Sequence, residues 1–245
     1  MEKDLGLCII SRKHRRIKMY ITFATLEGDN MNDSPNITRI LDILESLYPW
    51  DGTCFLHYKA PWQLLFATIL SAQCTDERVN QVTPQLFKKY PSLESFASAK
   101  LSELEEIIRS TGFYRAKARH LQESARRLLK EYNGQLPSDI KALTSLSGVG
   151  RKTANVARGH IYGIPSIVVD THVMRVTRRL GITNHTDPTK IEFELMEKLP
   201  EANWIRYNQQ VITHGRQICM ARSPRCGECM LKEECRDYTT KLEAL

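Results

Sequence analysis

The chain has 245 residues, a formal net charge of +7 and 42% hydrophobic residues, which is ordinary for a globular protein of one large or two modest domains. It contains no run of about 18 apolar residues, so we expect no membrane-spanning helix, and no secretory leader is recognisable. The positive charge favours a polyanionic partner only weakly, because many basic proteins never bind nucleic acid.

Residues 1–30 form an N-terminal extension that differs from the rest of the chain. It holds a basic run from Arg12 to Lys18, but the flanking residues lack the apolar periodicity of a helix. Acidic residues interrupt the extension, so it is a poor match to a targeting leader, and we expect it to be disordered.

Apolar residues recur at helical spacing through most of the remaining chain. The first stripe runs from Ile37 to Leu47 and ends at Tyr48-Pro49, and the uniformly apolar stretch 62–72 indicates a buried helix. Further helices are expected near residues 79–87, 101–108, 118–132, 140–146, from 152 onward, 171–181, 188–199 and 203–217. Only residues 167–169 have the character of a strand, so the predicted fold class is all-α.

The stretch from Leu146 to Lys152, LSGVGRK, joins two of these helices through a glycine turn. Gly148 and Gly150 permit positive φ and close backbone approach, while Val149 can pack between the helices. The free N–H groups in the first turn of the second helix favour an anion such as a phosphate. This pattern predicts a helix–hairpin–helix, although glycine turns between helices also occur as plain structural connections.

Lys152 lies at a helix N-terminus, where the macrodipole disfavours a cation by about 0.3–1 kcal/mol. The same field favours the neutral amine, which is the form that attacks carbon as a nucleophile. The alternative is a charged lysine that binds a phosphate. Asp170 follows the apolar run 167–169, where it either caps a helix or accepts a proton and stabilises positive charge at a reacting carbon.

Four of the seven cysteines are spaced C-x6-C-x2-C-x5-C, namely Cys219, Cys226, Cys229 and Cys235. Four thiols so close together predict a metal site, and two disulfides are the less favoured alternative in a chain without a secretory signal. A single C-x2-C with longer flanks favours an iron–sulfur cluster over zinc, because zinc ribbons usually use two short pairs.

Basic residues are concentrated in two stretches. Residues 109–130 carry seven Lys or Arg and one Glu, and residues 151–179 carry six Lys or Arg and one Asp. These stretches are either solvated helix faces or a surface that binds phosphates.

Together, these motifs resemble the endonuclease III family of DNA base-excision glycosylases, within the helix–hairpin–helix superfamily. The resemblance covers about residues 35 to 236 and includes LSGVGRKTANVA, VDTHVMRV and the cysteine spacing in the family's order. The segment LLFATILSAQCTD (64–76) looks like the family's DNA-facing helix end, and STGFYRAKA (110–118) looks like its second hairpin.

The resemblance implies two helical domains with a DNA-binding cleft between them. Residues 53–164 would form a six-helix barrel with the helix–hairpin–helix, and residues 31–52 plus 165–245 would form a discontinuous iron–sulfur cluster domain. The four cysteines would hold a 4Fe-4S cluster.

The implied function is that of a bifunctional DNA glycosylase/AP lyase in base-excision repair. It removes oxidised pyrimidines from double-stranded DNA and nicks the abasic strand by β-elimination. Lys152 is the implied nucleophile at C1′ and Asp170 the implied catalytic carboxylate, and the target nucleotide must leave the stack first. We expect a monomer that acts on damaged pyrimidines or abasic sites, does not bind membranes, and in a bacterium lies in the cytoplasm with the nucleoid.

The resemblance also implies DNA contacts. Gln73 matches the residue that fills the vacated space, and Phe113 matches an apolar wedge, with core packing as the alternative. Ser147 replaces a proline that is frequent in the hairpin, which predicts a looser turn. Other expected contacts are Gly148, Val149, Gly150, Arg151 and His172, and the pocket candidates are Ser71 and Asp76.

Two other functions remain open on the residues. A monofunctional glycosylase of the same superfamily lacks the lysine, so Lys152 argues against it. A non-catalytic DNA-binding or redox-sensing iron–sulfur protein would use Lys152 to bind phosphate and Asp170 to cap a helix.

Overall fold

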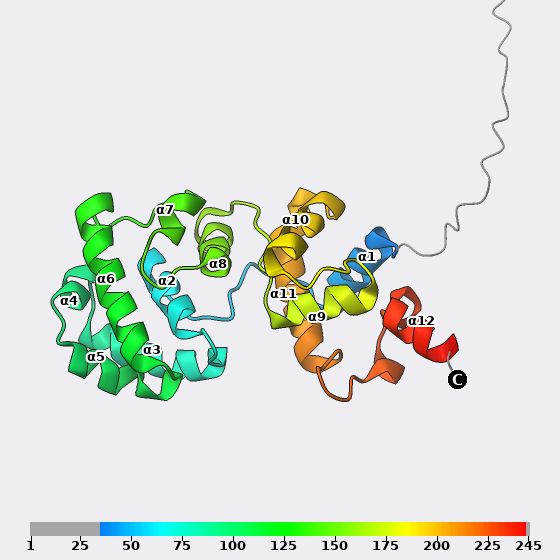
Figure 1. The fold of residues 1–245 in the computed structure, drawn as a ribbon, viewed down its shortest axis with the longest axis horizontal. Coiled ribbons are helices and arrows are strands. Elements are labelled where there is room, and N and C mark those ends of the chain that lie inside the picture. The colour runs from blue at the N-terminus through cyan, green and yellow to red at the C-terminus, as the bar shows by residue number, and fades with distance from the viewer. Residues whose placement is uncertain (1–34, 244–245) are drawn as a thin grey trace, which may run out of the picture. The chain divides into compact units, whose positions relative to one another are not determined.

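The structure is a computed structural model that describes residues 35–243. The extension predicted to be disordered, residues 1–30, lies outside the described residues. Every regular element between residues 35 and 243 is helical (Figure 1), which confirms the predicted all-α class. None of the helices in this range is long and apolar enough to cross a membrane.

The first half of the described chain contains α1 (Ile37–Leu47), α2 (Pro61–Leu70), α3 (Asp76–Lys89), α4 (Leu93–Ala97), α5 (Leu101–Ile108), α6 (Tyr114–Tyr132) and α7 (Ile140–Thr144). The second half contains α8 (Arg151–Tyr162), α9 (Thr171–Leu180), α10 (Pro188–Lys198), α11 (Trp204–Gln217) and α12 (Arg236–Glu243). Short 3-10 turns are η1 (Arg109–Thr111), η2 (Glu201–Asn203), η3 (Cys226–Glu228) and η4 (Lys232–Glu234). The periodicity missed α4 and α12, because α4 is too short for a stripe and α12 buries no residue.

Two hydrophobic clusters form the core. The first is built from α2 to α8, and the second joins α1 to the chain from residue 167 onward. Ile40 and Leu44 of α1 are fully buried in the second cluster, and α1 packs on α11, as Figure 1 shows. The described residues group as one compact unit, so the boundaries 53–164 and 31–52 plus 165–245 stay a prediction.

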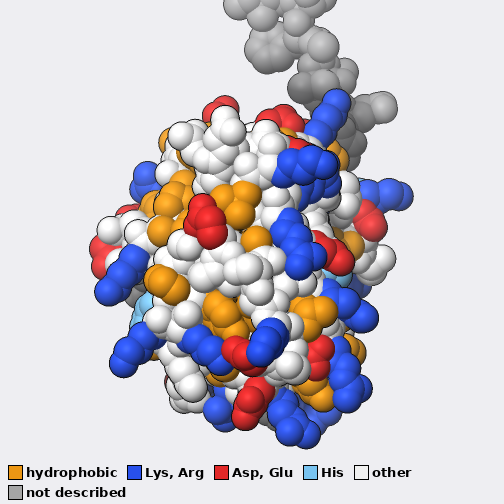
Figure 2. Space-filling view, turned by 90° about the vertical axis from the view of Figure 1, so that its left-hand side faces the viewer, with side chains coloured by type: hydrophobic (Ala, Val, Ile, Leu, Met, Phe, Trp, Pro, Cys, Tyr) orange, Lys and Arg blue, Asp and Glu red, His pale blue; other side chains and the backbone are white. Residues whose placement is uncertain are grey.

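The basic stretch 109–130 falls in η1 and α6. Figure 2 shows the face of the molecule that lies at the left of Figure 1, where Lys and Arg side chains are mixed with Asp and Glu. Arg127 pairs with Glu131 at 2.7 Å, Arg126 donates to the carbonyl of Ala97, and Lys117 is buried. Arg126, Arg127 and Lys117 therefore serve the fold, and the other four basic residues of the stretch are exposed.

Helices α8 and α11 meet through His160 and Gln209. The amide nitrogen of Gln209 lies 2.9 Å from Nε2 of His160, and because an amide nitrogen only donates, the imidazole accepts this bond in its neutral form. Trp50 contacts the same ring edge-on, with the two centroids 6.3 Å apart. Burial lowers the pKa of His160 below its ordinary value of 6.5.

The lowered pKa of His160 makes stability depend on pH, because the unfolded chain takes up this proton at a higher pH than the native state. The stability that neutral His160 contributes is fully present above about pH 6.5 and is lost as the pH falls toward the pKa of His160 in the native state. We expect His160→Gln to reduce the difference in unfolding free energy between about pH 7.5 and about pH 5.5, measured by urea denaturation. His57→Gln, at an exposed histidine, is the control, and equal effects of the two substitutions would contradict this assignment.

Candidate active site

A cavity of about 660 Å³ is lined by residues of both halves of the chain. Its walls come from the α2–α3 connection, α8, the segment before α9, the first turn of α9, and α11. It brings together six of the predicted site residues, namely Ser71, Gln73, Asp76, Lys152, Asp170 and His172. Phe113, the hairpin residues 148–151 and the four cysteines do not line it.

The hairpin before α8 depends on one of its two glycines. Gly148 has φ +74°, and a Cβ built on it would lie 2.8 Å from Cβ and Cγ of His120 in α6, so any larger residue would clash. Gly150 has φ −89° and open space around its Cα, so it does not use the positive φ that a glycine permits. Gly150 instead caps α8 without a side chain and leaves the helix N-terminus accessible.

Ser147 anchors the hairpin on α6. Its Oγ lies 2.9 Å from Nδ1 of His120 and donates to the carboxylate of Glu123, while its carbonyl accepts a 2.8 Å bond from the hydroxyl of Ser124. These bonds offset the preset φ that a proline would supply. The prediction of a looser hairpin did not take these side-chain bonds of Ser147 into account.

Val149 packs in the core, as expected, and its N–H donates to the carbonyl of Leu146 at 3.2 Å. Its side chain, predicted as a DNA contact, is therefore not available to DNA. Outward-facing donors at this turn are the free N–H groups of the first turn of α8.

Arg151, also predicted as a DNA contact, is paired inside the protein. Its Nε and Nη2 donate to the two carboxylate oxygens of Glu192 at 2.6 and 2.7 Å, and its guanidinium lies 4.9 Å from the ring centre of Phe193. This hydrogen-bonded pairing with Glu192 raises the pKa of Arg151. No local sequence pattern marks this pairing, because the two residues are 41 positions apart on α8 and α10.

Glu192 is buried and also accepts a 2.9 Å bond from Nδ2 of Asn155. Asn155 lies in α8, three residues after Lys152. The same Nδ2 donates to the carbonyl of Ile167 at 2.8 Å. One carboxylate therefore connects α8, which carries Lys152, to the extended segment that leads to Asp170.

The extended segment is also held from α11. The side-chain oxygen of Asn208 accepts a bond from the N–H of Val168, and its amide nitrogen donates to the carbonyl of Ser166, both at 3.0 Å. Asn208 thus takes the place of a neighbouring strand for this short segment and fixes the point where α9 begins.

Asp170 is the N-cap of α9. Its Oδ1 accepts bonds from the N–H groups of His172 and Val173, both at 2.8 Å, and Oδ2 takes part in neither bond. Asp170 therefore caps the helix and also presents its carboxylate in the cavity, so the two interpretations of this residue are compatible. Two N–H donors fix the carboxylate in place.

Lys152 is the second residue of α8 and is exposed to the cavity. Within residues 35–243 its Nζ has no hydrogen-bond or ion-pair partner. An amine without a carboxylate partner at the positive end of a helix is in a poor position for a purely structural role.

His172 lines the cavity beside Asp170 and is half-buried, with Nδ1 3.1 Å from Nη2 of Arg175. Burial lowers the pKa of His172; the charges of Arg175 and Arg216 act in the same direction, and Asp170 acts against them. The imidazole is therefore neutral at neutral pH and available as a hydrogen-bonding group.

Arg216 and Asp76 form an ion pair in the lining of the cavity. Nη2 of Arg216 lies 2.5 Å from Oδ2 of Asp76, and the guanidinium lies 4.5 Å from the ring centre of Phe55. Ser71, the other pocket candidate, donates its hydroxyl to the carbonyl of Thr68 at 2.9 Å. Sequence reasoning missed Asn155, although it lies one helical turn after Lys152, and it missed Asn208 and Glu192, which no local pattern marks.

Gln73 and Phe113 both lie in left-handed backbone, with φ +52° and +48°. Both side chains are exposed, and that of Phe113 is 67% exposed. The core-packing alternative for Phe113 is therefore wrong, because a large apolar side chain that faces solvent requires another explanation.

The four cysteines line one small cavity together with apolar residues of α9 and of the segment that follows α11. All four are free thiols, so the disulfide alternative is wrong. In the described part of the chain no three metal-binding side chains converge as they would on a single ion. Burial, with the three other cysteines adding to it, raises the pKa of the Cys229 thiol to about 11, so four thiolates here need a cationic group between them. The cavity and its donor set fit a cluster of several metal atoms.

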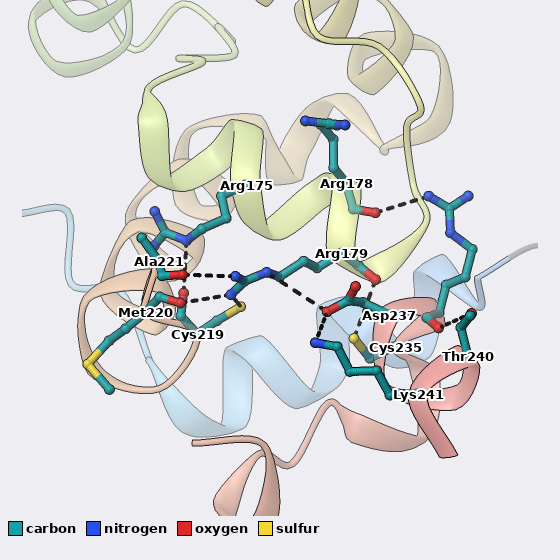
Figure 3. A network of polar contacts seen from close by, with 11 residues as sticks. Arg175, Arg178, Arg179, Cys219, Met220, Ala221, Cys235, Asp237, Thr240 and Lys241 are labelled. Carbon is teal, nitrogen blue, oxygen red and sulfur yellow. Dashed lines mark hydrogen bonds and ion pairs between the residues drawn. The ribbon is translucent and has the colours of Figure 1, made fainter. Parts of the chain in front are cut away.

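Arg179 of α9 holds the loop that begins at Cys219, as Figure 3 shows. Its guanidinium donates to the carbonyls of Met220 and Ala221 at 2.8 and 3.2 Å and lies 3.4 Å from Sγ of Cys219. The carbonyl of Arg179 lies 3.4 Å from Sγ of Cys235. A single residue therefore contacts the first and the last cysteine of the set.

Comparison with known proteins identifies the family. Residues 66–201 match the HhH-GPD superfamily of base excision DNA repair proteins, and residues 219–235 match the iron–sulfur binding domain of endonuclease III. The chain is 50% identical to endonuclease III of Synechocystis sp., over 81% of this chain and 90% of the relative. It is 36% identical to that of Escherichia coli, over 78% and 90%. The chain belongs to the endonuclease III family.

Solved structures of this family agree with the fold. A trapped endonuclease III–DNA covalent intermediate, in an estranged-adenine complex, matches with a TM-score of 0.80 and 42% identity over 84% of this chain and 97% of that one. A thermostable thymine-DNA glycosylase matches with a TM-score of 0.73 at 24% identity, which shows likeness of fold alone.

Membership of the endonuclease III family makes this chain a base-excision repair enzyme, a DNA glycosylase and AP lyase, with a 4Fe-4S cluster as its cofactor. The predicted family, fold class, enzyme class and cofactor are confirmed. The zinc alternative, which the cysteine spacing left open, is wrong, because the cysteine segment matches an iron–sulfur binding domain.

We expect Glu192→Gln to lower the free energy of unfolding by about 1–3 kcal/mol, because it removes the buried charge that pairs with Arg151. Excision should slow by roughly tenfold or more, since the supports of Lys152 and Asp170 loosen together. Urea denaturation and single-turnover cleavage measure the two effects. Glu197→Gln, at an exposed glutamate of the same helix, is the matched control; an unchanged cleavage rate in Glu192→Gln would contradict the supporting role.

Proposed function

We propose that this chain removes oxidised pyrimidines from double-stranded DNA and nicks the resulting abasic strand through covalent chemistry at Lys152. The observation that carries the proposal is that the unpartnered amine at the start of α8 shares a cavity of about 660 Å³ with the capped carboxylate of Asp170. A relative with 42% identity has been trapped as a covalent intermediate with DNA, which supports an amine nucleophile.

In this proposal the neutral amine of Lys152 attacks C1′ of the target nucleotide. The C1′–N bond to lysine forms as the glycosidic bond breaks, and the base leaves with the bonding electrons and takes up a proton from solvent. Asp170 stabilises the positive charge that develops on the sugar and accepts a proton from the amine. Opening of the sugar ring then gives a Schiff base, and loss of a C2′ proton expels the 3′ phosphate and nicks the strand.

The pocket assignments rest on the same cavity. The damaged nucleotide leaves the stack and enters between Lys152 and the pair formed by Asp76 and Arg216, with His172 as a neutral hydrogen-bonding group. Gln73 fills the space that the nucleotide leaves, and the exposed ring of Phe113 separates the neighbouring bases. The free N–H groups of Gly150 and of the first turn of α8 bind the DNA backbone.

Cys219, Cys226, Cys229 and Cys235 are the proposed ligands of the cluster. When bound, the cluster supplies four metal–thiolate bonds that fix the loop from residue 219 to 235, with no open position for substrate. Arg179 positions two carbonyls and one thiolate of the same loop. We propose that the enzyme acts as a monomer in the bacterial cytoplasm, with no membrane partner.

Borohydride trapping on duplex DNA with one thymine glycol tests the nucleophile. Wild type should give a covalent protein–DNA band, and Lys152→Ala should give none while binding the same duplex largely as before. Lys141→Ala removes an exposed lysine before the same hairpin and should keep the band. If Lys152→Ala loses binding as severely as cleavage, Lys152 is a phosphate-binding residue and the nucleophile assignment fails.

Cys226→Ser tests the ligand set through the metal itself. We expect a lower iron content per chain and loss of the visible absorption of the cluster, because one of four thiolates is missing. Cys74→Ser, at a cysteine that lines the cavity of Lys152 and Asp170, is the control and should keep both signals. Full iron content in Cys226→Ser would remove Cys226 from the ligand set.

A further inference from the structure

Lys117, on the first turns of α6, is a buried lysine that the chemistry described above does not use. Its side chain is 3% exposed, and its ammonium donates to the carbonyls of Leu70 and Thr111, each at 2.7 Å. Within residues 35–243 no carboxylate forms an ion pair with it. Burial lowers the pKa of Lys117, and the nearby Cys74 thiol acts in the opposite direction.

Both of its acceptors are the last residues of helical elements. Leu70 ends α2 and Thr111 ends η1, so each carbonyl lacks a full set of intrahelical partners and lies at the negative end of its element. An ammonium between two such carbonyls satisfies both of them. It also fixes the distance between the two chain segments, because both oxygens bond to one nitrogen atom.

These two segments lead directly to the residues proposed to enter the DNA. Gln73 lies three residues after Leu70, and Phe113 lies two residues after Thr111. The backbone N–H of Lys117 also donates to the carbonyl of Phe113 at 3.0 Å. Lys117 therefore contacts the base of both segments, although they are about forty positions apart in the chain.

Two energetic costs meet at this place. Gln73 and Phe113 both hold left-handed backbone, which is unfavourable for a non-glycine residue and persists only where the surroundings enforce it. An ammonium buried without a carboxylate is also costly, and an apolar side chain would fill the same space without that cost. Costs of this kind are concentrated at functional sites.

We propose that Lys117 is a positioning residue for base extrusion, which holds the Gln73 and Phe113 segments in one fixed register so that both side chains enter the same step of the DNA duplex. The inference rests on the proposed function, in which these two side chains act on DNA. Lys117 itself touches neither substrate nor Lys152.

Lys117→Met tests this role, because it keeps the length of the side chain and removes the ammonium. We expect single-turnover excision from a thymine glycol duplex to fall roughly 10- to 100-fold, while borohydride trapping on a single-stranded abasic oligonucleotide stays within about threefold of wild type. The single strand requires no base to leave a stack, so it reports the chemistry without extrusion. 2-Aminopurine placed beside the lesion should lose its fluorescence rise in the variant.

Lys130→Met, at an exposed lysine of the same helix, is the matched control and should leave both activities unchanged. A double-mutant cycle separates positioning from general structural support. In a Gln73→Ala/Phe113→Ala background the effect of Lys117→Met on duplex excision should largely disappear, because the residues that it positions are already absent.

Equal losses on duplex and single-stranded substrates, or an effect that persists fully in the double-alanine background, would overturn the proposal. If Lys117→Met does not fold, Lys117→Arg applies the same ratio, because the guanidinium keeps the charge but is too large and flat to occupy the position of a single nitrogen atom between the two carbonyls. In that variant an unchanged ratio of duplex to single-strand activity would overturn the proposal. Failure of wild type to form any adduct would instead mean that the proposed function itself is wrong.

Discussion

The arrangement of the active site depends on one buried carboxylate. Glu192 of α10 binds Arg151 through both oxygens and Asn155 through one of them, and Asn155 extends the contact to Ile167. A buried carboxylate is costly unless its oxygens are satisfied, so this network is stable only when α8, α10 and the segment before α9 are all in place. Lys152, the proposed nucleophile, and Asp170 are therefore brought together by a residue that lies outside the proposed chemistry.

Several residues combine a structural and a chemical role. Asp170 caps α9 with one oxygen and leaves the other out of the cap, so the bonds that begin the helix also orient the carboxylate. Gly148 allows the close packing of the hairpin on His120, and this packing sets the direction in which α8 begins. In both cases the requirement of the fold and the requirement of the site are met by the same contact.

In the cluster region a whole helix, α9, serves both the fold and the site. Arg179 reaches from α9 to the backbone of the loop after Cys219 (Figure 3), and Asp170 is the N-cap of the same helix. The helix that carries the carboxylate at one end therefore supports the metal-binding loop at the other. A single helix therefore joins the cysteine-rich loop to the wall of the cavity that holds Asp170.

The sequence by itself determined the helices, the hairpin and the cysteine set, because each is a pattern of neighbouring residues: the stripe from Ile37 to Leu47, Gly148 before Lys152, and four thiols within a short segment. Through the resemblance to the family, it also marked Lys152 and Asp170 as the candidate catalytic residues. Only the tertiary structure decided that Arg151 is occupied by Glu192 and that Lys117 joins two distant helix ends. These contacts join residues far apart in the chain, and periodicity carries no information about which distant side chains meet.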